Sequence, residues 1–125
     1  IPLGTKDYYD QVIQKLGGLG NVSAFARLFL LPGLGHCFTP DPKSKTPNNV
    51  DLVSALEQWV EKGKAPDSLI ASHLAGEAGG MGEGLSMGMP IVGKTDRTRP
   101  ICAYPAVAVY KGAGSIDDAA NFSCR

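Results

Sequence analysis

The chain has 125 residues and a mass of 13.1 kDa, which is enough for one domain. Twelve Lys and Arg residues balance twelve Asp and Glu residues, so the charge indicates neither a nucleic-acid-binding face nor an acidic tail. No apolar run reaches the about 20 residues that a membrane-spanning helix needs. We therefore expect residues 1–125 to belong to a single domain, with no nucleic acid and no membrane among its partners.

The first residue is Ile1, and no signal-peptide pattern follows it, so we expect a processed chain or a piece of a longer one. Three cysteines make an odd number, so if two pair, the third is free or binds a cysteine outside the chain. Two sequons, at Asn21 and Asn121, are candidate glycosylation sites. Together these features favour an oxidising, extracellular location.

The first predicted element is a helix from Thr5 to Leu16. Its apolar residues recur at helical spacing, Thr5 can cap its start, and the pair Gly17-Gly18 ends it. We expect the adjacent Tyr8 and Tyr9 to belong to the core rather than to a site.

The next segment, Ala26–Leu31, reads as a short buried strand that stops at Pro32 and enters a glycine-rich loop. The loop carries His36 beside Cys37. A lone histidine in the loop after an apolar strand is how α/β-hydrolases position the general base of a catalytic triad. An imidazole with a pKa near 6.5 can take a serine proton and return it to a leaving alcohol.

A second helix is predicted from Asn48 or Asn49 to Gly63, with Trp59 as a core anchor in its apolar stripe. A short extended segment, Ser68–Ser72, follows, and residues 75–93 read as a mobile surface loop rich in Gly, Ala, Met and Ser. Residues 97–125 show no clear period and are expected to form a coil. Helix, strand, histidine loop and helix is the order in which an α/β-hydrolase sheet ends, so we predict the α/β class.

Three other patterns in the sequence could indicate a functional site, but each lacks a feature that such a site needs. The sequence around Ser86 matches G-x-S-x-G, but no buried strand precedes it and the serine should come before the histidine, so we reject it as nucleophile. The glycines at 79–84 lack the Lys-Ser/Thr of a phosphate loop. The cysteines lack zinc-ligand spacing, so no metal is expected. Cys37 could also be a nucleophile paired with His36, but we favour the hypothesis that it forms a disulfide.

Several segments resemble the carboxyl-terminal part of the tannase and feruloyl esterase family. They are residues 5–9 (TKDYY), 27–37 (RLFLLPGLGHC), 55–67 (ALEQWVEKGKAPD), 97–105 (RTRPICAYP) and 110–122 (YKGAGSIDDAANF). Residues 75–93 look like an insertion relative to shorter members.

The resemblance implies that His36 is the triad histidine. It implies that Cys37 is bonded to a cysteine beside the catalytic serine, and that Cys102 pairs with Cys124. The serine, the aspartate and a lid with structural calcium would then lie upstream of Ile1, so this chain would hold no cofactor of its own.

We therefore expect the carboxyl-terminal portion of a secreted α/β-hydrolase serine esterase that acts on aromatic-acid esters, feruloyl or galloyl. It would be active only with the missing part, and we expect a second polypeptide piece of the same enzyme, joined through Cys37, to supply that part. The rival hypothesis is a non-catalytic secreted fragment or binding module in which His36 is structural.

Overall fold

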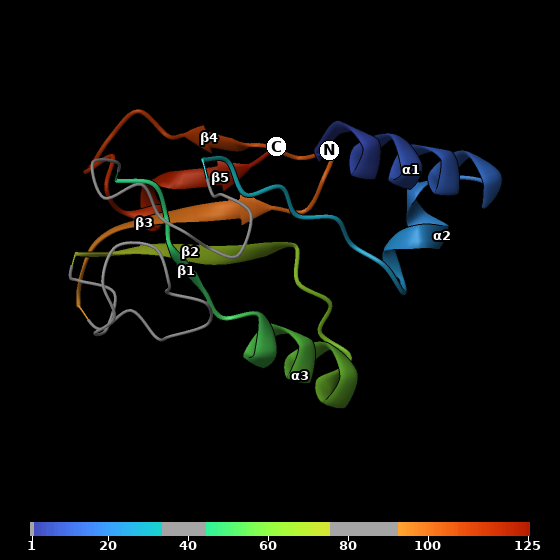
Figure 1. Ribbon diagram of the computed structural model, residues 1–125, viewed down its shortest axis with the longest axis horizontal. Coiled ribbons are helices and arrows are strands. Elements are labelled where there is room, and N and C mark those ends of the chain that lie inside the picture. The colour runs from blue at the N-terminus through green and yellow to red at the C-terminus, as the bar shows by residue number, and fades with distance from the viewer. Residues whose placement is uncertain (1, 34–44, 76–92) are drawn as a thin grey trace, which may run out of the picture.

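A computed structural model describes residues 2–33, 45–75 and 93–125. Its helices are α1 (Pro2–Lys15), α2 (Leu19–Ser23), α3 (Leu52–Lys62) and a short 3-10 helix, η2 (Ala119–Asn121). Its strands are β1 (Asn49–Val50), β2 (Ser68–Ala75), β3 (Lys94–Cys102), β4 (Ala108–Tyr110) and β5 (Phe122–Cys124) (Figure 1). The chain thus combines helices with sheets, as the α/β prediction requires.

The centre of the fold is a three-stranded sheet in the order β1-β2-β3, in which both strand pairs are antiparallel. The long β2–β3 ladder runs from Ser68 opposite Cys102 to Ala75 opposite Lys94. The predicted extended segment 68–72 is therefore confirmed and continues to Ala75. The connection 76–92, which holds most of the predicted surface loop, lies outside the described residues.

The carboxyl-terminal segment is not the coil that the sequence suggested. Residues 97–102 belong to β3, and β4 pairs with β5 in a second, two-stranded antiparallel sheet. This sheet lies alongside β3, where Thr98 donates its backbone N–H to Asp117 and accepts the N–H of Ala119 on its Oγ1 at 2.8 Å (Figure 1). Strand β3 could not be predicted from its own sequence, because it is rich in polar residues and its pairing partner, β2, is distant along the chain.

The small core lies under the β2–β3 ladder. Leu69, Ala71 and Ile101 are buried there, and four partly buried residues pack against them: Phe29, Leu31, Val50 and Ala55. These side chains come from the segment before the histidine loop, from β1 and from α3, so the core joins all three to the ladder.

The predicted strand at 26–31 is largely wrong for the described part of the chain. It forms only an isolated bridge between Phe29 and Ala103, and the Leu28 carbonyl accepts the Tyr104 N–H at 2.8 Å. Phe29 and Leu31 nonetheless pack on the core while Leu30 is 41% exposed, which is the alternation of a strand. The side-chain pattern is therefore present without a full backbone ladder.

Helix α1 confirms the first predicted helix, but it begins at Pro2, so the expectation that Thr5 caps its start is wrong. Only one of its tyrosines is buried. Tyr9 is 9% exposed, donates its hydroxyl to the Ala26 carbonyl and packs edge-on against Tyr104, whereas Tyr8 is 69% exposed. Burial raises the pKa of the Tyr9 phenol. The expectation that both tyrosines are core residues is thus wrong for Tyr8, which lies on the outer side of the helix.

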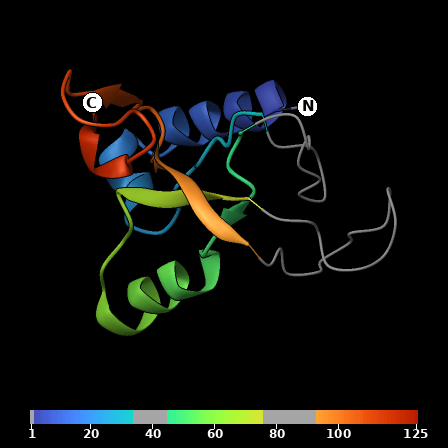
Figure 2. The same cartoon turned by 90° about the vertical axis from the view of Figure 1, so that its left-hand side faces the viewer.

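Helix α3 confirms the second predicted helix, with a later start. Asp51 caps it by accepting the Ser54 N–H at 2.9 Å, and Gly63 ends it in the left-handed conformation at φ 65°. The hydrogen bond from Ser54 lowers the pKa of the Asp51 carboxyl. Figures 1 and 2 show that the helix stands away from the strands, below the sheet in both views. Trp59 is only half-buried, so it is not the core anchor that we expected.

Candidate active site

The predicted base, His36, and its neighbour Cys37 lie in residues 34–44, outside the described residues. The structure does describe both ends of this segment, and they touch. Gly33 has φ +74°, and a Cβ added to it would lie 2.4 Å from Cγ2 of Thr46. Only glycine adopts this backbone conformation without strain and leaves room for Thr46. The residues on either side of the segment that carries His36 therefore lie next to each other.

On the entry side, Arg27 joins three parts of the fold. Its Nε donates to the Ser23 carbonyl at 3.3 Å, its Nη1 donates to the Pro66 carbonyl at 2.9 Å, and the same nitrogen forms an ion pair with Asp67. The guanidinium also lies over the Trp59 ring, 5.9 Å from its centroid. Arg27 thereby holds α2, α3 and the turn before β2 around the segment that leads to His36.

On the exit side, the hairpin end of β3 holds Lys45. Arg97 donates from Nη1 to the Lys45 carbonyl at 3.3 Å and forms an ion pair with Asp117 at 2.6 Å. The Lys45 ammonium lies 3.8 Å from a carboxylate oxygen of Asp96. Backbone and side-chain contacts from β3 therefore fix the chain where it leaves the histidine segment.

Asn48 adds a further anchor on the same side. It is 7% exposed, and its amide both donates to the Leu74 carbonyl at 3.2 Å and accepts the Leu74 N–H at 2.9 Å. Leu74 adjoins the irregularity in the β2–β3 register, where Asp96 is the extra residue between the pairs His73–Arg97 and Leu74–Thr95. The Asn48 side chain thus satisfies backbone groups next to this bulge.

The bulge creates a histidine–aspartate pair that the sequence analysis missed. Nδ1 of His73 lies 2.5 Å from Oδ1 of Asp96, and the His73 side chain is 15% exposed. The hydrogen bond with His73 lowers the pKa of the Asp96 carboxyl, so the carboxylate form accepts and Nδ1 carries the proton. The pair depends on hairpin register, and no local motif in the sequence signals it.

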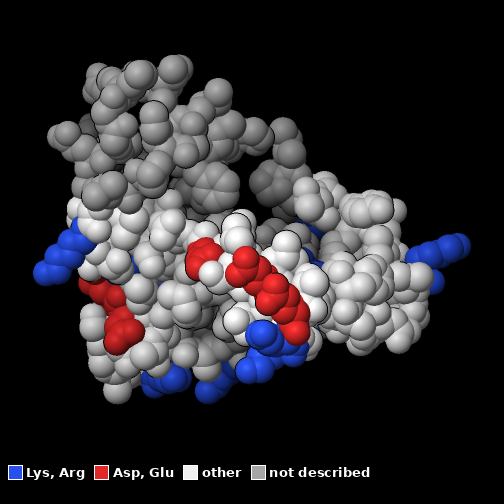
Figure 3. Space-filling model, turned by 90° about the horizontal axis from the view of Figure 1, so that it is seen from below, with Lys and Arg blue, Asp and Glu red and all other residues white. Residues whose placement is uncertain are grey.

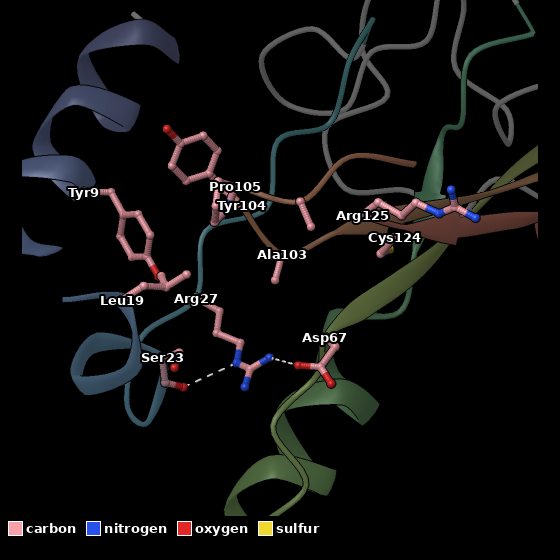
Figure 4. Close-up of a pocket in the computed structure, with 11 residues that line it drawn as sticks. Tyr9, Leu19, Ser23, Arg27, Asp67, Ala103, Tyr104, Pro105, Cys124 and Arg125 are labelled. Carbon is pink, nitrogen blue, oxygen red and sulfur yellow. Dashed lines mark hydrogen bonds and ion pairs between the residues drawn. The ribbon is translucent and has the colours of Figure 1, made fainter. Parts of the chain in front are cut away.

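A pocket of about 510 Å³ opens between α1, α2 and the end of β3 (Figure 4). Arg27 projects into it, but its charge is already matched by Asp67. Among the described residues, the lining contains Ser23 but no histidine that could serve as the base of an esterase site. Its residues are Tyr9, Leu19, Ser23, Arg27, Asp67, Ala103, Tyr104, Pro105, Ala106, Cys124 and Arg125.

The remaining predicted site residues lie in the described part. Cys102 and Cys124 form a disulfide with Cα atoms 5.6 Å apart, which is the pairing that the resemblance implies. Asn21 is exposed in α2 and donates its side-chain amide to the Leu16 carbonyl at 2.7 Å. Asn121 is half-buried and donates to the Ser115 carbonyl at 2.9 Å. Both sequon asparagines thus make a local hydrogen bond, and their glycosylation stays a prediction.

The described residues contain no group of three or more His, Cys, Asp or Glu side chains that could hold a metal ion. Among the helices in residues 2–33, 45–75 and 93–125, none has the length and apolar character needed to cross a membrane.

Comparison with solved structures points to the esterases. Over 97% of its length the chain is similar to an esterase from Aspergillus oryzae, with a TM-score of 0.72 and 26% identity. It is also similar to feruloyl esterase B from the same fungus, with a TM-score of 0.70 and 25% identity. The chain covers 24% and 23% of these two structures, respectively.

Sequence comparison defines the family. The model of the family "Tannase and feruloyl esterase" matches residues 1–125, and the chain belongs to this family. It is 38% identical to the mono(2-hydroxyethyl) terephthalate hydrolase of Piscinibacter sakaiensis and 35% identical to a probable feruloyl esterase of Arthroderma benhamiae, over 98% of its length in both cases. The resemblance drawn from the sequence is therefore confirmed. The chain spans 17% and 20% of the length of these two relatives.

Proposed function

We propose that this chain is the carboxyl-terminal part of a secreted serine esterase with an α/β-hydrolase fold, which hydrolyses esters of aromatic acids such as feruloyl or galloyl esters. The observation that carries the proposal is the family match over residues 1–125, which include the segment with His36. The names of similar proteins, feruloyl esterases and a terephthalate ester hydrolase among them, support an aromatic-acid ester as the substrate.

In this mechanism His36 takes the proton of an upstream serine hydroxyl as the serine oxygen attacks the ester carbonyl. The resulting tetrahedral intermediate collapses, and His36 gives the proton to the departing alcohol, which leaves an acyl-enzyme. His36 then deprotonates a water molecule, whose attack releases the aromatic acid and restores the serine. An upstream aspartate would hold the imidazole in the required tautomer. Cys37 would link the base to the serine segment by a disulfide.

The anchors at both ends of residues 34–44 support this role. A general base must stay within hydrogen-bond reach of its proton donor, so the segment that carries it needs fixed ends. The contact of Gly33 with Thr46, together with the hydrogen bond from Arg97 to Lys45, provides such ends.

A second candidate for the base is His73, because its Nδ1 already faces the Asp96 carboxylate in the manner of a triad histidine. We favour His36, because the family resemblance includes it in a long matched segment and because the His73 side chain bonds to no serine among the described residues.

The test is the hydrolysis of methyl ferulate and methyl gallate by the complete esterase, as one polypeptide or as two chains. We expect His36→Ala to lower kcat/KM by about 1000-fold or more, because the loss of a triad member removes the general base. His73→Gln should stay within a few-fold of the wild type. The reverse result would assign the base to His73, and full activity in both variants would favour the non-catalytic alternative.

The proposed Cys37 disulfide has its own measurement, the intact mass before and after reduction. A two-chain esterase should separate on reduction into a 13.1 kDa species and a partner. An esterase in one polypeptide should instead yield a peptide pair that contains Cys37 after digestion without reduction. A free Cys37 thiol in the active enzyme would contradict the proposed link between base and nucleophile.

A further inference from the structure

The outer side of α3 is apolar and uncovered. Four of its side chains, which we name the α3 stripe, are 48% to 75% exposed: Leu52, Val53, Leu56 and Val60. At 3.6 residues per turn they fall within about 100° of the helix circumference, so they form one continuous surface. Single exposed apolar residues are ordinary, but a complete helical stripe is not.

The other sides of α3 either contact the rest of the chain or carry polar residues, so the stripe is not the only side of the helix that water can reach. Ala55 packs against the core, and Trp59 faces Arg27. Glu57, Gln58 and Glu61 lie outside the stripe and are also exposed. Figure 3, which views the molecule from the α3 side, shows a row of acidic side chains next to uncharged surface. Because the charged residues of α3 already form a solvent-exposed surface, we expect the apolar stripe to be buried in a contact.

Two observations indicate what covers the stripe. The chain covers 24% and 23% of the two solved esterase chains that it resembles, so most of an esterase of this kind lies outside it. In addition, residues 29–31 have the side-chain alternation of a strand. Among the described residues, however, this segment pairs only with the two residues that follow β3, through the bridge of Phe29 with Ala103 and the hydrogen bond from the Tyr104 N–H to the Leu28 carbonyl. A strand of this kind requires further strands beside it, and sheets of α/β domains are covered by amphipathic helices.

We propose that the α3 stripe packs against the upstream portion of the same esterase domain. Helix α3 is then a second, non-covalent link between this chain and that portion, beside the disulfide proposed for Cys37. The inference rests on the proposed function and adds to it the surface through which the two portions bind. The acidic side of α3 stays in water in the assembled enzyme.

The test uses the complete esterase with a benzophenone amino acid in place of Val53, at the margin of the stripe, or in place of Gln58 on the polar side as the matched control. After irradiation, cross-linked peptides are identified by mass spectrometry. We expect position 53 to cross-link to upstream peptides at least ten times more than position 58. Cross-links from position 53 to residues 76–92, to a second copy of the enzyme or to nothing would overturn the proposal.

A pair of charged variants gives an independent readout. Leu56→Glu should lower the melting temperature of the complete esterase by about 4 °C or more, because it places a charge in an apolar contact, whereas Gln58→Glu should leave it unchanged. Equal melting temperatures for the two variants would overturn the docking of α3. The hydrolysis assay with His36→Ala is separate, so loss of hydrolysis in that variant with no effect of Leu56→Glu rejects the docking and leaves the proposed function standing. The opposite combination rejects the function and retains the docking.

Discussion

Gly33 combines a left-handed backbone with a neighbour that leaves no room for a side chain. In Gly33→Ala the new methyl group would meet Cγ2 of Thr46 at 2.4 Å, so the two ends of the His36 segment must separate. We expect a loss of about tenfold in kcat/KM for methyl ferulate, since misplacement of a catalytic group by about 1 Å can cost up to about 100-fold.

The control for this variant is Gly112→Ala. Gly112 also has a positive φ, +90°, but a Cβ there would meet nothing within 4 Å. It should therefore show the backbone strain, about 1–2 kcal/mol, without the loss of activity. If both variants lose activity alike, the contact between Gly33 and Thr46 does not position the base.

Asp96 should make stability depend on acid pH. Its hydrogen bond with His73 lowers its pKa in the folded state below the value of about 3.9 found in unfolded chains. The stabilisation is therefore fully present above about pH 4 and is lost as pH falls through the lower folded pKa. We expect Asp96→Asn to melt below the wild type at pH 5, with a gap that narrows towards pH 2.5. A gap that stays constant over this range would show that Asp96 is not stabilised as the carboxylate.

The residue scale also limits what sequence can reveal about the site. The peptide around His36 could be identified because strand, proline, glycines and histidine are consecutive. His73 and Asp96 are 23 residues apart, and they meet only because a bulge in the β2–β3 register brings the extra residue against the histidine. Pattern analysis of one sequence contains no signal for such a register. The anchoring roles of Arg27 and Arg97 were missed for the same reason.

At the scale of elements, the junction of β1 and β2 depends on Asn48. Asn48→Ala would leave the N–H and carbonyl of the half-buried Leu74 without their side-chain partners. We expect a loss of about 2–3 kcal/mol in unfolding free energy. Hydrogen exchange should also show lower protection of the Leu74 amide, which separates a local effect from a general one.

The neighbouring Asn49 is exposed, so Asn49→Ala is the matched control and should change stability by less than about 0.5 kcal/mol. Unchanged exchange at Leu74 in Asn48→Ala would contradict the proposed anchor.

The helices could be predicted because the residues that end them, glycines above all, lie next to them in the sequence. Gly17-Gly18 and Gly63 stop α1 and α3 where we expected, but both helix starts moved: α1 begins at Pro2 rather than at Thr5, and the cap of α3 is Asp51 rather than Asn48 or Asn49. The displaced asparagines are used by the sheet instead, Asn48 as a side-chain anchor and Asn49 in β1. Strand β3 was missed because it is rich in polar residues and pairs with β2 over a long separation. Strands β4 and β5 were missed because each has three residues, which is too short to show an alternating pattern.

At the scale of the whole molecule, the Cys102–Cys124 disulfide ties the end of the two-stranded sheet to the end of β3 across a sequence separation of 22 residues. In the chain-entropy account, closing a loop of this length stabilises the fold by about 3 kcal/mol. We expect the double variant Cys102→Ala with Cys124→Ala to lose about that much in urea unfolding. A loss below about 1 kcal/mol would mean that the contacts of β4 and β5 hold the tail without the bond.

Ala75 and Lys94 face each other across the outermost rung of the β2–β3 ladder, so the chain leaves the sheet and re-enters it at one place. When the ends of a connection are held in this way, each doubling of its length costs only about 0.6 kcal/mol of closure entropy. The register of β2 on β3 therefore does not depend on the length of the connection. Relatives can gain or lose residues here without disturbing the sheet, and a fused reporter domain would be tolerated best at this same point.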